Sequence, residues 1–118
     1  MAWEFKSDRP IYTQLLEQIE LKIISGDYKA GDRLLSVRDL AAEAAVNPNT
    51  MQRALAELER MGLVYSQRTS GRTVTEDKEL IHRIKEEIAM QHIEEFLVTM
   101  KKLGYTKEEI IRLMEEKE

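Results

Sequence analysis

Residues 46–74, VNPNTMQRALAELERMGLVYSQRTSGRTV, constrain the fold most strongly, because they combine the signals of a helix with those of a β-hairpin. Asn47 is a favourable helix N-cap, and Pro48 occupies the first helical position, where its missing N–H group costs nothing. Gly62 stands where a left-handed residue commonly ends a helix. Between these ends, apolar residues at helical spacing define one buried face: Met51, Ala54, Leu55, Leu58 and Met61.

The first turns of this helix are polar on the side away from that face. They carry side chains that can hydrogen-bond a base edge or a phosphate: Asn49, Thr50, Gln52 and Arg53. Residues 63–65 then predict a strand, and residues 68–72 predict an exposed basic turn. A polar helix start followed by a basic hairpin is typical of a recognition helix with a wing. The segment therefore predicts a DNA-binding regulator.

A shorter helix is predicted immediately before the recognition helix. Ser36 and Asp39 have the spacing of a capping box, in which each side chain bonds the backbone of the other residue. Residues 44–46 would form the turn of a helix-turn-helix. Because the first helix of such a pair normally crosses the phosphate backbone, we expect DNA contacts from Ser36 and Arg38.

Two further features are predicted before residue 36. Pro10 opens a helix that ends at Ser25 and Gly26, and Trp3 and Phe5 precede it in a short strand or an extended arm. We expect both aromatic side chains to pack on the core rather than to stack on a base. Gly31 and Asp32 then mark a turn, which leads to the capped helix.

The sequence changes character at Glu76, where a helical tail is predicted. One long helix, over about residues 77–103, is followed by Gly104 and by a second capping box, Thr106 to Glu109, that opens a short last helix. A hairpin of only two helices has too little mass to bury both apolar stripes, so we expect the long helix to pair with a second copy of the chain. The residues predicted for this interface are Ile81, Ile84, Ile88, Ile93, Phe96, Leu97, Met100 and Leu103.

Charge and composition exclude several classes of protein. Residues 1–75 contain ten basic and ten acidic residues and residues 76–118 contain eight and twelve, so the tail carries the whole net charge of −4 and DNA contact should be confined to a small surface. The absence of cysteine excludes disulfides and thiolate zinc sites, and no apolar run is long enough to span a membrane. His82 and His92, about 15 Å apart on one helix, cannot share a metal within a subunit. We therefore expect a cytoplasmic protein without metal or cofactor.

The run AGDRLLSVRDLAAEAAVNPNTMQRALAELERMGLVYSQRTSGRTV closely resembles the winged-helix domain of the GntR family of bacterial transcription factors. PIYTQLLEQIELKIISGDY resembles the first helix of that domain, and the tail, with FLVTMKKLGYTKEEIIRLMEE, is similar to the YtrA-like subfamily. The resemblance implies a mainly α fold with a small β wing: a winged helix-turn-helix at residues 1–75 and a two-helix dimerisation hairpin at 76–118. It further implies a homodimer that represses transcription from an inverted-repeat operator, often beside ABC-transporter genes.

The resemblance also transfers the DNA contacts of the family. They fall on Ser36, Arg38, Asn47, Asn49, Thr50, Gln52, Arg53, Arg68, Thr69, Gly71 and Arg72. Three positions depart from the family pattern. Leu35 replaces a proline before the cap. Thr69 replaces the first glycine of the wing, so close approach of the wing to the minor groove is an open question. Ala45 replaces a glycine in the helix–helix turn, at a cost of about 1 kcal/mol if the backbone there is left-handed.

Two other classes of function remain as alternatives. An enzyme would need a nucleophile–base pair, a carboxylate pair or a glycine-rich phosphate loop, and the sequence contains none of these patterns. A winged-helix module that binds proteins without DNA is the second alternative, and the basic wing argues against it. A tail of this size is too small to enclose a ligand pocket, so an effector, if one exists, would bind at the dimer interface.

Overall fold

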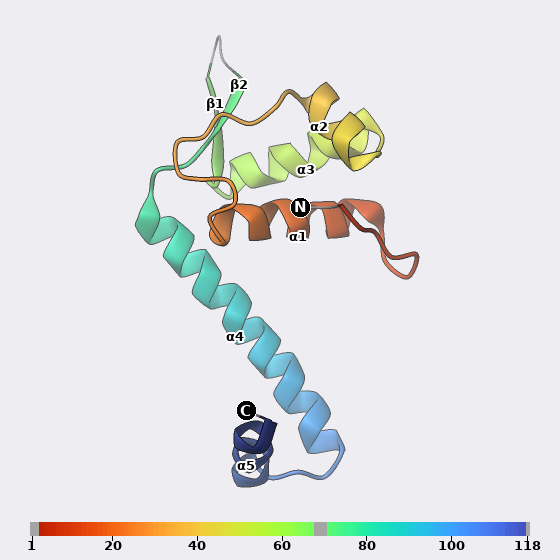
Figure 1. The fold of residues 1–118 in the computed structure, drawn as a ribbon, viewed down its shortest axis with the longest axis vertical. Coiled ribbons are helices and arrows are strands. Elements are labelled where there is room, and N and C mark those ends of the chain that lie inside the picture. The colour runs from red at the N-terminus through yellow and green to blue at the C-terminus, as the bar shows by residue number, and fades with distance from the viewer. Residues whose placement is uncertain (1–2, 68–70, 118) are drawn as a thin grey trace. The chain divides into compact units, whose positions relative to one another are not determined.

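The computed structural model describes residues 3–67 and 71–117, and they fall into two compact units. One unit extends to Arg83 and the other begins at Ile84, so that the boundary lies within the long helix α4 (Lys78–Lys102). The first unit contains the helices α1 (Ile11–Ile24), α2 (Val37–Ala44) and α3 (Pro48–Arg60) and the strands β1 (Val64–Gln67) and β2 (Gly71–Val74) (Figure 1). The second unit contains the rest of α4 and α5 (Lys107–Lys117). This is the predicted winged helix-turn-helix followed by two helices.

The core of the first unit lies where α1 packs across α3 (Figure 1). Leu15 and Ile19 of α1 and Leu55 and Leu58 of α3 are all at most 1% exposed. The second face of α3 receives α2 and β1. The core is completed by buried side chains from α2, the helix–strand turn and the hairpin: Leu40, Ala41, Ala44, Leu63, Val64 and Val74.

The ends of α3 follow the predicted signals. The Asn47 side chain accepts a hydrogen bond from the backbone N–H of Asn49 at 2.7 Å, and Pro48 begins the helix. At the other end Gly62 adopts φ +83°, and the N–H of Leu63 bonds the carbonyl of Leu58 at 3.0 Å. Glycine is required here because this backbone conformation disfavours a side chain. The chain then enters β1 directly, which sets the wing beside the recognition helix.

The wing has a third hydrogen-bonded segment that the sequence did not predict. β1 and β2 pair antiparallel, with Tyr65 opposite Thr73. On the free edge of β2, Arg33 forms a further antiparallel bridge with Thr73. Three backbone bonds of 2.8–3.0 Å accompany this bridge, between Gly31 and Val74, Val74 and Asp32, and Leu34 and Arg72. The loop that leads into α2 is therefore attached to the wing.

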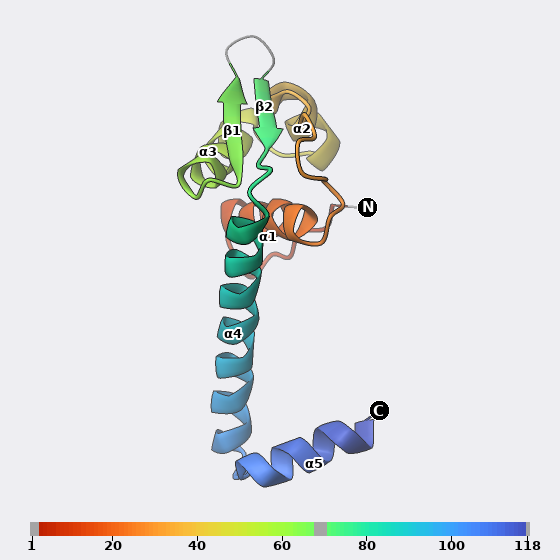
Figure 2. The same cartoon turned by 90° about the vertical axis from the view of Figure 1, so that its left-hand side faces the viewer.

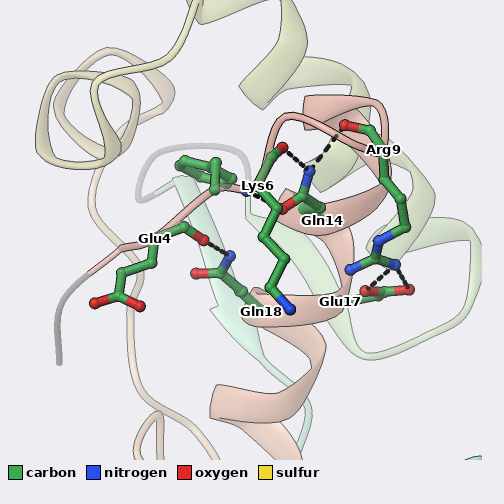
Figure 3. A pocket seen from close by; sticks show the side chains of 7 residues that line it. Glu4, Lys6, Arg9, Gln14, Glu17 and Gln18 are labelled. Carbon is green, nitrogen blue, oxygen red and sulfur yellow. Dashed lines mark hydrogen bonds and ion pairs between the residues drawn. The ribbon is translucent and has the colours of Figure 1, made fainter.

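The N-terminal arm is held against α1 by glutamine side chains (Figure 3). The buried Gln14 accepts a hydrogen bond from the N–H of Lys6 and donates to the carbonyls of Lys6 and Arg9, all within 2.8 Å. Trp3 is half-buried, as expected: its indole N–H donates to Glu43 of α2 at 2.9 Å, and the ammonium of Lys22 lies 3.7 Å from its ring centre. The arm thus joins α1 to α2.

In the second unit, α4 ends at the predicted glycine. Gly104 has φ +99°, and Thr106 and Glu109 form both bonds of the predicted capping box, at 2.9 and 3.2 Å. The bond from Thr106 holds the pKa of the Glu109 carboxyl below its usual value. Figure 2 shows α5 leading away from the end of α4 rather than back along it. The two helices therefore cover little of each other, and Ile110 is the buried residue of α5.

The turn between α2 and α3 contains a left-handed alanine. Ala45 has φ 57° and ψ 45°, and it is the non-glycine residue with positive φ among residues 3–67 and 71–117. The N–H of Val46 bonds the carbonyl of Ala41 at 3.0 Å, which closes the end of α2. The condition under which the alanine was expected to cost stability is thus met.

We predict that Ala45→Gly stabilises the protein by about 1 kcal/mol, because glycine adopts this conformation without strain. Urea unfolding followed by circular dichroism measures the change. Ala42→Gly is the matched control: Ala42 is exposed within α2, and glycine there should destabilise by a similar amount. A loss of stability in both variants would contradict the assigned strain.

Candidate nucleic-acid interface

The recognition helix presents a polar ridge on the side opposite the core. At 100° per residue, Asn49, Arg53 and Ala56 lie within about 60° of one another and face away from Leu58. All three are exposed, and so is Gln52, which is turned towards the wing. Thr50 is half-buried on the other flank. The Asn47 side-chain oxygen is occupied in capping, which leaves its amide group as a donor. The predicted helix contacts are thus gathered at one end of α3.

The start of α2 carries two further predicted contacts, Ser36 and Arg38. The hydroxyl of Ser36 accepts a hydrogen bond from the N–H of Asp39 at 3.1 Å, as predicted. Among the described residues the return bond from the Asp39 carboxylate is not formed, in contrast to the box at Glu109. Aspartate is one methylene shorter than glutamate, which accounts for the difference. Arg38 is exposed, and in the described part of the chain its guanidinium has no acidic partner.

The wing differs from its predicted role at one position. Arg68 and Thr69, two of the predicted contacts, lie outside the described residues. Gly71 begins β2 with φ +76° and is exposed. Arg72 does not stand at the tip of the wing: its Nε donates to the Glu59 carboxylate of α3 at 2.7 Å, and only 17% of its side chain is exposed. The positive charge of Arg72 is therefore compensated by the carboxylate of Glu59.

Glu59 joins the recognition helix to both strands of the wing. The same carboxylate oxygen accepts a bond from the hydroxyl of Ser66 in β1 at 2.7 Å. The Ser66 hydroxyl and the Arg72 guanidinium together lower the pKa of Glu59 below its usual value, so the group stays ionised at neutral pH. Because β1 and β2 are both attached to α3 through one side chain, the wing has a defined orientation beside the polar ridge.

Two residues near the ridge were not predicted from the sequence. Arg33 is exposed and is held by its bridge to β2, between the wing and the start of α2. Tyr12 of α1 lies under the guanidinium of Arg53, with 3.8 Å between its ring centre and the Cζ atom. Both depend on contacts between segments far apart in sequence, so no local pattern could have identified them.

The residues predicted for dimerisation differ in exposure. Ile84 is buried, whereas Ile93, Phe96 and Leu103 are each more than 40% exposed. The others have intermediate exposure: Ile81, Ile88, Leu97 and Met100. The exposed members of this set therefore all lie in the second unit, on or directly after α4 and beyond residue 89.

Known proteins are similar to this chain in sequence and in fold. Residues 11–74, more than half of the chain, match the family model described as "Bacterial regulatory proteins, gntR family". This chain belongs to the GntR family. As a member it is a DNA-binding transcriptional regulator and not an enzyme, as the sequence predicts. DNA binding by the family also removes the alternative of a winged-helix module that binds only proteins.

Individual relatives extend the likeness to the tail. The regulator YhcF of Bacillus subtilis is 39% identical over 108 residues, which cover 92% of this chain and 89% of YhcF. The repressor YtrA of the same organism is 40% identical over 72 residues, covering 61% of this chain and 55% of YtrA.

Solved structures show the same fold. A GntR family regulator from Listeria monocytogenes has 46% identity and a TM-score of 0.90, over 95% of this chain and 98% of that one. The DNA-binding domain of AraR in complex with operator ORR3 has 27% identity and a TM-score of 0.54, over 64% of this chain and 88% of that one. Among residues 3–67 and 71–117, no helix is long and apolar enough to cross a membrane.

Replacing Arg72 or Arg38 by glutamine removes the same charge, but the two substitutions should affect different properties, stability and DNA binding. Arg72→Gln breaks a shielded ion pair and leaves Glu59 without its partner, so it should lower the free energy of unfolding by about 1 kcal/mol. Arg38→Gln should leave stability unchanged and weaken operator binding by about 1–3 kcal/mol. Urea unfolding and fluorescence anisotropy with operator DNA measure the two effects. A variant of Arg38 that binds as tightly as the wild type would remove it from the interface.

Proposed function

We propose that this protein is a homodimeric repressor that binds an inverted-repeat operator. The observation that carries the proposal is the exposed polar ridge at the start of α3, with Asn49, Gln52 and Arg53, together with the exposed Arg38 of α2. In this proposal Gln52 and Asn49 contact base edges in the major groove, and Ser36 and Arg38 contact the backbone or a guanine. The related YtrA is a transcriptional repressor, which favours repression over activation.

The apolar surface of the second unit supports a dimer. Eight large apolar side chains between residues 84 and 117 are more than a third exposed: Met90, Ile93, Phe96, Val98, Leu103, Tyr105, Ile111 and Met114. A monomer rarely leaves so much apolar area in water. A second copy of α4 and α5 is the partner proposed, because Ile93, Phe96, Leu97 and Met100 repeat along one face and can pack against the same face of another copy.

Phe96→Glu should separate the dimer into monomers, since a charge would be buried in the interface. Light scattering of the full chain measures the mass. Gln91→Glu is the control, because Gln91 lies two residues from Ile93, hence about 200° around the helix. A dimer that persists in Phe96→Glu would place the interface elsewhere.

The operator should have a fixed spacing between its half-sites. A two-fold dimer presents the same ridge to each half-site, so the centres should lie about one helical turn, roughly 10 bp, or a multiple of it, apart. Inserting about 5 bp turns one half-site to the opposite face of the duplex, and affinity should fall to that of a single half-site. Electrophoretic mobility shift assays with the two operators measure the loss. Undiminished affinity would show that the two subunits are not rigidly joined.

The proposal also covers the setting in which the protein acts. A repressor of this kind works in the bacterial cytoplasm, at the nucleoid when it is bound to its operator. The YtrA-like tail favours control of a transporter operon. Transcript levels of the neighbouring genes with and without the regulator test this part separately from operator binding. No effector is assigned.

A further inference from the structure

We propose that Tyr12 of α1 is a positioning residue for DNA binding: its ring holds the guanidinium of Arg53 in place to contact a phosphate at the edge of the major groove. The inference rests on the proposed role of the polar ridge of α3. It adds to the interface a residue from a helix that has no direct part in base recognition.

The geometry places an aromatic face under the cation. The Cζ atom of Arg53 lies 3.8 Å from the centre of the Tyr12 ring, within the range in which a guanidinium is attracted to the ring quadrupole. Tyr12 is half-buried in the first turn of α1, and α1 packs across α3. The ring is thus fixed by the core contact between the two helices, and it restricts a long side chain that would otherwise sample many rotamers.

Nearby ion pairs distinguish Arg53 from the other arginines of α3 and the wing. Glu57 lies one turn after Arg53, where it could neutralise it, but Glu57 bonds Arg60 instead. This pairing lowers the pKa of Glu57 and raises that of Arg60. Arg72 is likewise paired with Glu59. Among the described residues of α3 and β2, Arg53 is therefore the arginine whose charge is not compensated by a carboxylate.

A stacked guanidinium keeps its positive charge and its N–H donors, which are what a phosphate contact needs. An aromatic ring attracts the cation without neutralising it, and stacking occupies the face of the guanidinium while its N–H groups point outward in the plane. Two of these donors can bind two phosphate oxygens at once. Arg53 is exposed on the outer ridge of α3, one turn after Asn49, so it extends from the same side of α3 as the proposed base contacts.

A double-mutant cycle tests whether Tyr12 acts through Arg53. The variants are Tyr12→Leu, Tyr12→Phe, Arg53→Ala and the double variant Tyr12→Leu with Arg53→Ala, each in the full chain. Ile11→Ala is the matched control, because Ile11 is exposed in the same turn of α1 and is not the residue that stacks on Arg53. Affinity is measured for an operator selected from random DNA and for an unrelated duplex, over a series of salt concentrations. Thermal unfolding confirms that each variant is folded, and Tyr12→Met replaces Tyr12→Leu if the latter is not.

The expected result is a loss through Arg53 alone. Arg53→Ala should reduce the salt slope by about 1 per half-site, because one phosphate contact is lost. Tyr12→Leu should weaken binding about three- to fivefold per half-site, equally for both duplexes, and Tyr12→Phe and Ile11→Ala should change it less than about twofold. In the Arg53→Ala background, Tyr12→Leu should have no further effect.

Three results would overturn the proposal. Equal losses from Tyr12→Leu with and without Arg53 would give the ring a structural role only. A loss from Tyr12→Phe as large as that from Tyr12→Leu would assign the effect to the hydroxyl. An unchanged affinity and salt slope in Arg53→Ala would remove the phosphate contact, while operator binding by the wild-type chain would leave the proposed function standing.

Discussion

The packing of α3 against α1 determines the remaining geometry of the DNA-binding unit. Leu55 and Leu58 are almost completely buried there. Because one face of α3 is fixed against the core, the opposite face is necessarily the one that is exposed. The angle between buried and exposed residues then places Asn49 and Arg53 outward. The burial of a Leu side chain of this kind contributes about 2 kcal/mol, so rotation of α3 out of this position is strongly disfavoured. The exposure of the residues proposed to contact bases is in this sense a consequence of the core.

The elements around α3 are joined to it by a tight turn and by hydrogen bonds between segments. The left-handed Ala45 sets the angle between α2 and α3, and Glu59 attaches both strands of the wing. The bridge at Arg33 connects the wing to the loop before Ser36. Among the described residues, the predicted contacts on α2, α3 and β2 thus belong to elements that are joined by hydrogen bonds, although these elements lie far apart in the sequence.

The sequence was informative where the decisive interactions are local. The ends of α3 and α4 follow from Asn47, Pro48, Gly62 and Gly104, because a cap or a left-handed residue acts within one turn of its own position. Local patterns could not show that Arg72 faces Glu59, since thirteen residues separate them and a basic residue in a turn is equally compatible with a free side chain. The same holds for Tyr12 and Arg53. The sequence also overestimated Asp39, whose spacing fits a capping box but whose side chain is too short to complete it.

The position of Trp3 makes it an intrinsic fluorescence probe of the protein. It is the single tryptophan of the chain, and it contacts Glu43 of α2 and Lys22 of α1. Indole emission depends on the polarity and the charges around the ring, so a small change in the separation of these two helices would alter the fluorescence without any label. Because α2 carries Ser36 and Arg38, the emission of Trp3 should report on the helix that is proposed to contact the phosphate backbone.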